Sequence, residues 1–66
     1  MRIAVNGVER EAAPGLTVLE LLRELRLDPE AVVVERNGEV AARRDLGRMT
    51  LQEGDRLELV RFVGGG

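Results

Sequence analysis

The alternation of apolar and polar positions at the start of the chain predicts a β-hairpin over residues 2–13. Its two strand-like segments are separated by Asn6-Gly7, a dipeptide that favours the two-residue type I′ turn. Across such a turn Val5 pairs with Val8, so Ile3, Val5 and Val8 share one face of the hairpin. Arg10 falls on that face too, which indicates that the pattern loosens near the end of the second strand.

The next segment has helical periodicity. Thr17 lies three residues before Glu20, the spacing of a capping box in which each residue's side chain accepts a hydrogen bond from the other residue's backbone N–H. The positions expected to form one apolar stripe, at i, i+3, i+4 and i+7, are Val18, Leu21, Leu22 and Leu25. We expect Leu27-Asp28-Pro29 to end the helix, because a residue before proline avoids the α conformation.

A second hairpin is predicted over residues 31–42, around Asn37-Gly38. Its first strand contains Val32-Val33-Val34, and three consecutive valines predict apolar contact on both faces of that strand. Residues 43–49 are expected to be irregular or a single helical turn, anchored by Leu46 and Met49. After a turn at Glu53-Gly54-Asp55, residues 56–63 have the pattern of a last strand.

This order of elements predicts an α+β domain with a mixed sheet of four to five strands packed on one main helix. Each hairpin uses one edge of its strands, so the first and last strands are expected to lie side by side and parallel. That arrangement is the β-grasp, or ubiquitin-like, fold. We assign residues 1–63 to the domain and residues 64–66 to a flexible glycine tail; 66 residues leave no room for a second domain.

Composition narrows the function. The chain has no Cys or His, so the usual zinc sites, a disulfide framework and His- or Cys-dependent nucleophilic catalysis are excluded. A net charge of −2 and one aromatic residue argue against nucleic acid as a partner. No apolar stretch approaches membrane-spanning length and no export leader opens the sequence, which favours a cytoplasmic protein. We expect a protein that is acted on, rather than an enzyme.

The run Gly64-Gly65-Gly66 directly after a strand admits two interpretations. It is a frayed end or cloning remnant, or it is a probe about 10 Å long that enters a slot no wider than a backbone. The probe would deliver its terminal carboxylate, which is ionised and unreactive at neutral pH. A partner enzyme would have to activate it, typically as an acyl-adenylate, before a sulfur donor displaced AMP to leave a thiocarboxylate.

The Gly-Gly terminus, the segment Glu35-Arg36-Asn37-Gly38-Glu39 and the ending Val60-Arg61-Phe62-Val63-Gly64-Gly65-Gly66 resemble the ThiS family, the bacterial sulfur carriers of thiamine thiazole synthesis. The resemblance covers essentially the whole chain. It implies that an E1-like enzyme of the ThiF type adenylates Gly66 and that Gly64, Gly65 and Gly66 thread into the partner's active site. A persulfide then supplies sulfur for a ThiG-type thiazole synthase. ATP is used by the activating partner, and the chain carries no cofactor or metal of its own.

Alternation in the last strand indicates where a partner would dock. Leu57 and Leu59 are expected to face the helix, which leaves Val60 and Phe62 on the open face of the sheet. With Val63 and part of the valine run, they form a predicted docking surface for the activating enzyme. The alternative is that Phe62 belongs to the core, as large apolar residues usually do.

Other interpretations remain open at this stage. The small subunit of molybdopterin synthase uses a similar fold and tail, and a ubiquitin-like modifier or passive interaction module is a third possibility. The absence of lysine and cysteine suits an activated acyl carrier, but GC-rich coding bias explains it as well. The basic residues Arg43, Arg44 and Arg48 are interpreted as a solvated face, and Glu53 and Asp55 have too few ligands for calcium.

Overall fold

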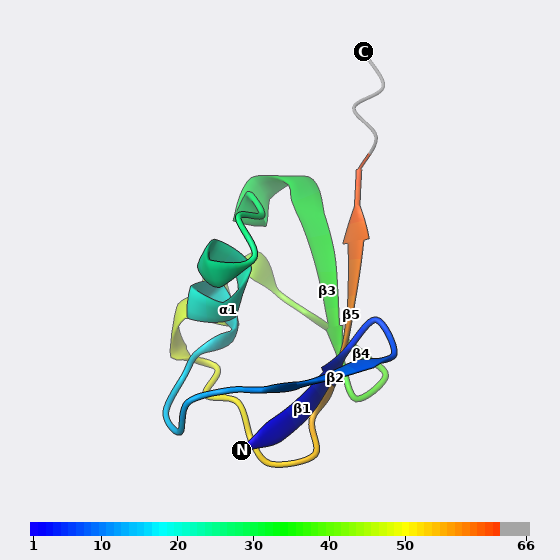
Figure 1. The fold of residues 1–66 in the computed structure, drawn as a ribbon. Helices are drawn as coiled ribbons and strands as arrows, with labels where there is room; N and C mark the ends of the chain where they lie inside the picture. The colour runs from blue at the N-terminus through cyan, green and yellow to red at the C-terminus, as the bar shows by residue number, and fades with distance from the viewer. Residues whose placement is uncertain (63–66) are drawn as a thin grey trace.

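A computed structural model describes residues 1–62 and contains one five-stranded mixed sheet with the order β2-β1-β5-β3-β4 (Figure 1). The central strand β5 pairs in parallel with β1 and antiparallel with β3, while β2 and β4 form the two edges. The strands are β1 Arg2–Val5, β2 Val8–Glu11, β3 Val32–Arg36, β4 Glu39–Ala41 and β5 Arg56–Arg61. The predicted β-grasp arrangement, with the first and last strands parallel neighbours, is confirmed.

Both hairpins turn at the predicted Asn-Gly dipeptides. Asn6 and Asn37 have φ angles of 50° and 52°, and the glycines that follow, Gly7 and Gly38, have φ angles of 82° and 87°. Positive φ at both central residues defines a type I′ turn, and asparagine and glycine tolerate it best. Local sequence chemistry therefore sets the register of both hairpins.

The helix α1, Val18–Glu24, begins as predicted. The backbone N–H of Glu20 donates to Oγ1 of Thr17 at 3.1 Å, and the backbone N–H of Thr17 donates to Oε1 of Glu20 at 2.9 Å. These two bonds complete the capping box and satisfy two N–H groups that the helix itself leaves without partners.

The prediction for the end of this helix was wrong. The helix ends at Glu24, and Arg26 follows in the left-handed conformation, with a φ of 59°. The N–H of Leu27 donates to the carbonyl of Leu22 at 2.8 Å, the six-to-one bond of a Schellman motif. Pro29 instead begins the 3₁₀ turn η1, Pro29–Ala31, so it lies beyond a helix that other contacts have already ended.

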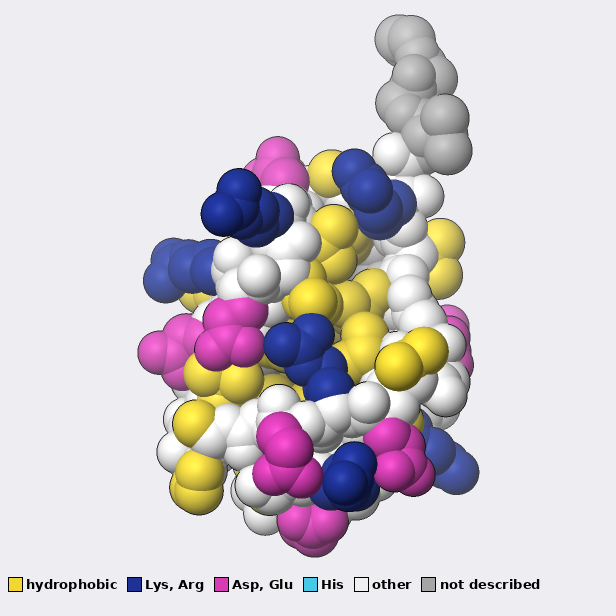
Figure 2. All heavy atoms as spheres, viewed as in Figure 1, with side chains coloured by type: hydrophobic (Ala, Val, Ile, Leu, Met, Phe, Trp, Pro, Cys, Tyr) yellow, Lys and Arg dark blue, Asp and Glu magenta, His cyan; other side chains and the backbone are white. Residues whose placement is uncertain are grey.

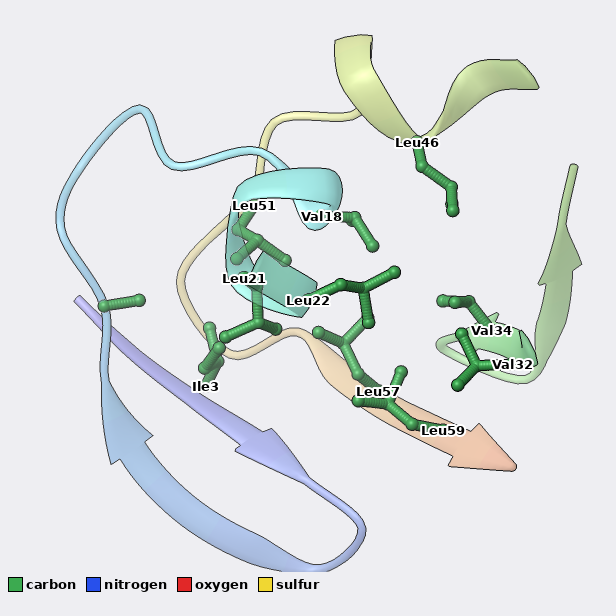
Figure 3. Close-up of a cluster of buried hydrophobic side chains, with 11 residues drawn as sticks. Ile3, Val18, Leu21, Leu22, Val32, Val34, Leu46, Leu51, Leu57 and Leu59 are labelled. Carbon is green, nitrogen blue, oxygen red and sulfur yellow. The ribbon is translucent and has the colours of Figure 1, made fainter. Parts of the chain in front are cut away.

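One face of the sheet packs against α1 and the 3₁₀ segment η2, Arg43–Arg48 (Figure 3). Of the predicted stripe, Val18, Leu21 and Leu22 are buried, while Leu25 is half-buried at the rim. Leu46 is a buried anchor as predicted, and Met49 packs at the margin. The buried apolar residues are Ile3, Ala12, Val18, Leu21, Leu22, Val32, Val34, Leu46, Leu51, Leu57 and Leu59.

Candidate functional site

The strand that leads to the glycine run has one buried and one exposed face. Leu57 and Leu59 are 1% and 7% exposed beneath the helix, whereas Val60 and Phe62 are each 55% exposed on the opposite face. The predicted alternation is confirmed, and the alternative that Phe62 is a core residue is wrong. The exposure is an observation; the role of these two residues in docking stays a prediction.

The apolar surface around Val60 draws on neighbouring strands. Val33 is the cross-strand partner of Val60, and Val40 of β4 lies on the same face and is 69% exposed. We call Val33, Val40, Val60 and Phe62 the open-face patch. Of the valine run, only Val33 belongs to it. Val32 and Val34 are buried against the helix, because side chains alternate along a strand. The expected apolar contact on the outer face is therefore confined to Val33.

Two interactions hold the end of β5 in place. The N–H of Phe62 donates to the carbonyl of Ala31 at 2.9 Å, which continues the pairing with β3 one residue past the strand. On the other side, β1 stops at Val5, and the side chain of Asn6 takes the place of a strand. Its Oδ1 accepts from the N–H of Leu59 at 2.7 Å, and its Nδ2 donates to the Leu59 carbonyl at 3.3 Å.

The importance of Asn6 for β5 was missed in the sequence. The Asn-Gly dipeptide marked the turn, but a glycine or aspartate could have served that turn, and nothing local indicated a bond to a residue 53 positions away. By pairing both polar groups of Leu59, Asn6 protects the open edge of β5 and helps to keep the strand extended toward its end.

Asp55 is a second residue whose role the sequence did not reveal. Only 5% exposed, it is the buried charged residue of the described chain. Its carboxylate accepts from Asn37 Nδ2 at 3.0 Å and from the backbone N–H of Gln52 at 2.9 Å, and it pairs with Nε of Arg36 at 3.2 Å. These contacts join the second hairpin to the turn before β5, so they serve the fold. Within residues 1–62 no cluster of three or more acidic, His or Cys residues could hold a metal ion.

The predicted basic group is mostly engaged in local contacts. Nε of Arg43 donates to the carbonyl of Pro29 at 2.9 Å, which ties η2 to η1. Arg48 donates to Asp45 at 2.8 Å, and this hydrogen bond holds the pKa of the Asp45 carboxyl below its usual range, with Arg44 adding a weaker effect. In the view of Figure 2, acidic and basic side chains are interspersed around the apolar side chains visible between helix and sheet. We assign no site to the arginines.

The remaining predicted site residues, Val63, Gly64, Gly65 and Gly66, lie outside the described residues. The structure describes the segment that precedes them: the central strand β5, which is hydrogen-bonded on both sides and ends beside the open-face patch. In the part of the chain described, no helix is long and apolar enough to span a membrane.

The model of the ThiS family matches residues 3–66. The chain belongs to the ThiS family. A crystal structure of the thiamine biosynthesis protein ThiS from Geobacter metallireducens is 40% identical and covers the whole of both chains, with a TM-score of 0.85. The sulfur carrier protein ThiS of Bacillus subtilis is 38% identical over 50 residues, which are 76% of each chain.

The chain is also similar to part of a larger protein. A thiazole synthase of Paramagnetospirillum magneticum is 41% identical over 66 residues, which are all of this chain and 20% of that protein. The chain therefore spans about a fifth of the length of this relative. A domain of this kind thus occurs within a chain named for thiazole synthesis.

Proposed function

We propose that this protein is a sulfur carrier of thiamine biosynthesis. The carboxylate of Gly66 is adenylated by an ATP-dependent, E1-like enzyme of the ThiF type, converted to a thiocarboxylate, and presented to a ThiG-type thiazole synthase. The observation that carries the proposal is the ThiS family match over residues 3–66 in a chain that ends in three glycines. The thiazole synthase relative supports the choice of acceptor.

The chemistry asks for no catalytic side chain from the carrier. A carboxylate oxygen attacks the α-phosphorus of ATP, and pyrophosphate leaves. The terminal sulfur of a persulfide then attacks the acyl carbon and displaces AMP, forming an acyl disulfide. A thiol of the activating system attacks the donor's sulfur, so that the S–S bond breaks and the carrier leaves as a thiocarboxylate. A chain without Cys, His or Lys has no thiol, imidazole or ε-amine of its own to intercept the acyl-adenylate.

The described structure supports this role through the position of the open-face patch. Val60 and Phe62 are exposed immediately before the residues that must enter the partner's active site. An enzyme seated on these side chains would hold the start of the tail at a fixed distance from its ATP site. We propose that Val60, Phe62 and Val63 dock the activating enzyme in this way, with Gly64, Gly65 and Gly66 threaded beyond them.

Intact-mass analysis after incubation with the activating enzyme, ATP and a persulfide donor tests the proposal. We expect a product heavier by the difference between sulfur and oxygen, and its loss when thiazole synthase and its substrates are added. Deletion of Gly66 is the matched control, since it leaves the described domain intact and should abolish both ATP–pyrophosphate exchange and the mass increase. Equal sulfur transfer by the shortened chain would refute the proposal. A mass increase that persists after thiazole synthase and its substrates are added would refute the proposed sulfur acceptor, but not the sulfur-carrier role.

A further inference from the structure

Two glutamates are paired across adjacent strands on the open side of the sheet. Glu35 of β3 and Glu58 of β5 are direct cross-strand partners, on the face opposite to their buried neighbours Val34 and Leu59. Side chains in such a position have Cβ atoms about 4.5–5.5 Å apart, and like charges there destabilise a sheet. Glu58 is exposed and Glu35 is half-buried.

Within residues 1–62, neither carboxylate has a salt-bridge partner. The two arginines nearest along the strands do not supply one. Arg36 points to the other face and pairs with Asp55 at 3.2 Å. Arg56 shares the face of Glu58 but makes no salt bridge to any residue that the structure describes. Two other carboxylates on this side of the sheet do have a cationic partner, because Glu9 and Glu11 both lie within 4 Å of Arg2. From the register we therefore expect the like-charged pair to cost stability locally, and no salt bridge within residues 1–62 offsets that cost.

The pair borders the open-face patch. Along β3 and β5, the row formed by Val33 and Val60 comes next to the row formed by Glu35 and Glu58, and Val40 flanks Glu35 on β4. A protein that covers the apolar rows must also cover the carboxylates or approach them closely. Removing two like charges from water without a counter-charge is strongly unfavourable, so the covering surface has to provide a cation.

We propose that Glu35 and Glu58 are a charge-recognition element for the activating enzyme. The partner surface that fits is an apolar hollow for Val33, Val60 and Phe62 with an arginine or lysine side chain beside it, placed between the two carboxylates. An arginine is the better fit, because its planar fork bonds two carboxylate oxygens at once. The like-charge repulsion in the free carrier is relieved on binding, which favours the complex. This inference rests on the proposed function.

The inference predicts opposite effects on stability and on binding. Glu35→Gln and Glu58→Gln each remove the repulsion, so the melting temperature of the free carrier should rise by about 2–5 °C. Each should also raise the KM of the activating enzyme for the carrier about three- to tenfold in ATP–pyrophosphate exchange, with kcat unchanged. Glu39→Gln is the matched control: it removes one exposed charge from the edge strand on the opposite sheet face, and its KM should stay within twofold of wild type.

Salt provides a second readout. The KM of the wild-type carrier should rise between about 50 and 300 mM salt, and the doubly substituted carrier should show a much flatter dependence, since the screened attraction is gone. The inference would be overturned if the KM of both single variants were unchanged, or if it rose no more than the KM of Glu39→Gln. Activation of the wild-type carrier would still uphold the proposed function in that case. If the wild-type carrier were not adenylated at all, the proposed function itself would fail, and the inference with it.

Discussion

Replacement of Asp55 by alanine is the most direct test of how the turn before β5 is held. The substitution removes the acceptor of three donors at once: Nε of Arg36, Nδ2 of Asn37 and the backbone N–H of Gln52. Because the Asp55 side chain is 6% exposed, water replaces it poorly at these donors. The Arg36 side chain is 24% exposed, so its cation regains part of its hydration.

These contacts set the expected magnitude. Breaking a fully buried ion pair by removing one partner costs about 3–5 kcal/mol, and each neutral donor left without a partner costs about 1–3 kcal/mol. Since Arg36 is partly hydrated and Asn37 is exposed, we expect Asp55→Ala to lower the free energy of unfolding by about 3 kcal/mol. A chain of this length is stabilised by roughly 3–10 kcal/mol in total, so this loss would remove about a third of that stability or more.

Urea denaturation followed by far-ultraviolet circular dichroism is the suitable assay, because the chain has no Trp or Tyr for fluorescence. The urea midpoint should fall while the slope of the transition stays unchanged. Asp55→Asn keeps the shape and one acceptor oxygen, so it should lose about half as much. In a double-mutant cycle, Arg36→Ala and Asp55→Ala should couple by about 1–2 kcal/mol. A loss below about 1 kcal/mol for Asp55→Ala would refute the reasoning.

Three further predictions concern single residues. Asn6→Gly keeps the positive φ of the turn but removes both bonds to Leu59, so it should cost about 1–2 kcal/mol and speed hydrogen exchange at the Leu59 amide; unchanged protection there would contradict the assignment. Phe62→Ala should lower the free energy of unfolding by less than about 1 kcal/mol, because the residue is already half exposed, yet lower kcat/KM for adenylation about tenfold. A loss of several kcal/mol with intact adenylation would show that Phe62 serves the core and not docking. Arg26→Gly relieves a left-handed backbone conformation and should raise the free energy of unfolding by about 0.5–1 kcal/mol, a gain that thermal melting would detect and that a lower melting temperature would exclude.

The features that the sequence predicted well depend on chemistry within a few residues. The capping box of Thr17 and Glu20 needs only a spacing of three, and the two Asn-Gly turns need only backbone freedom at two positions. Alternation along the last strand placed Leu57 and Phe62 on opposite faces for the same reason. These local preferences also agree with one another, and together they were enough to indicate the order of the strands.

The features that were missed depend on contacts between distant segments. The end of the helix is the exception, because the bond that closes it, from the N–H of Leu27 to the carbonyl of Leu22, spans only five residues and ends the helix before Pro29. The valine run looked apolar on both sides, although only the position of the helix decides which valines are buried. No residue near Asp55 in the sequence indicates that its carboxylate will pair with Arg36 and accept a hydrogen bond from Asn37.

By itself the sequence determined the turns, the helix start, the apolar periodicity and the glycine ending, since each is written in the chemistry of neighbouring residues. The tertiary structure alone decided which valine joins Val60 on the open face, that Asn6 closes the edge of β5, and that Glu35 stands opposite Glu58. Those pairings arise only when strands from different parts of the chain come into register. Within each hairpin the turn sets the register, but the register of β5 against β1 and β3 is a property of the assembled sheet, and no single segment contains it.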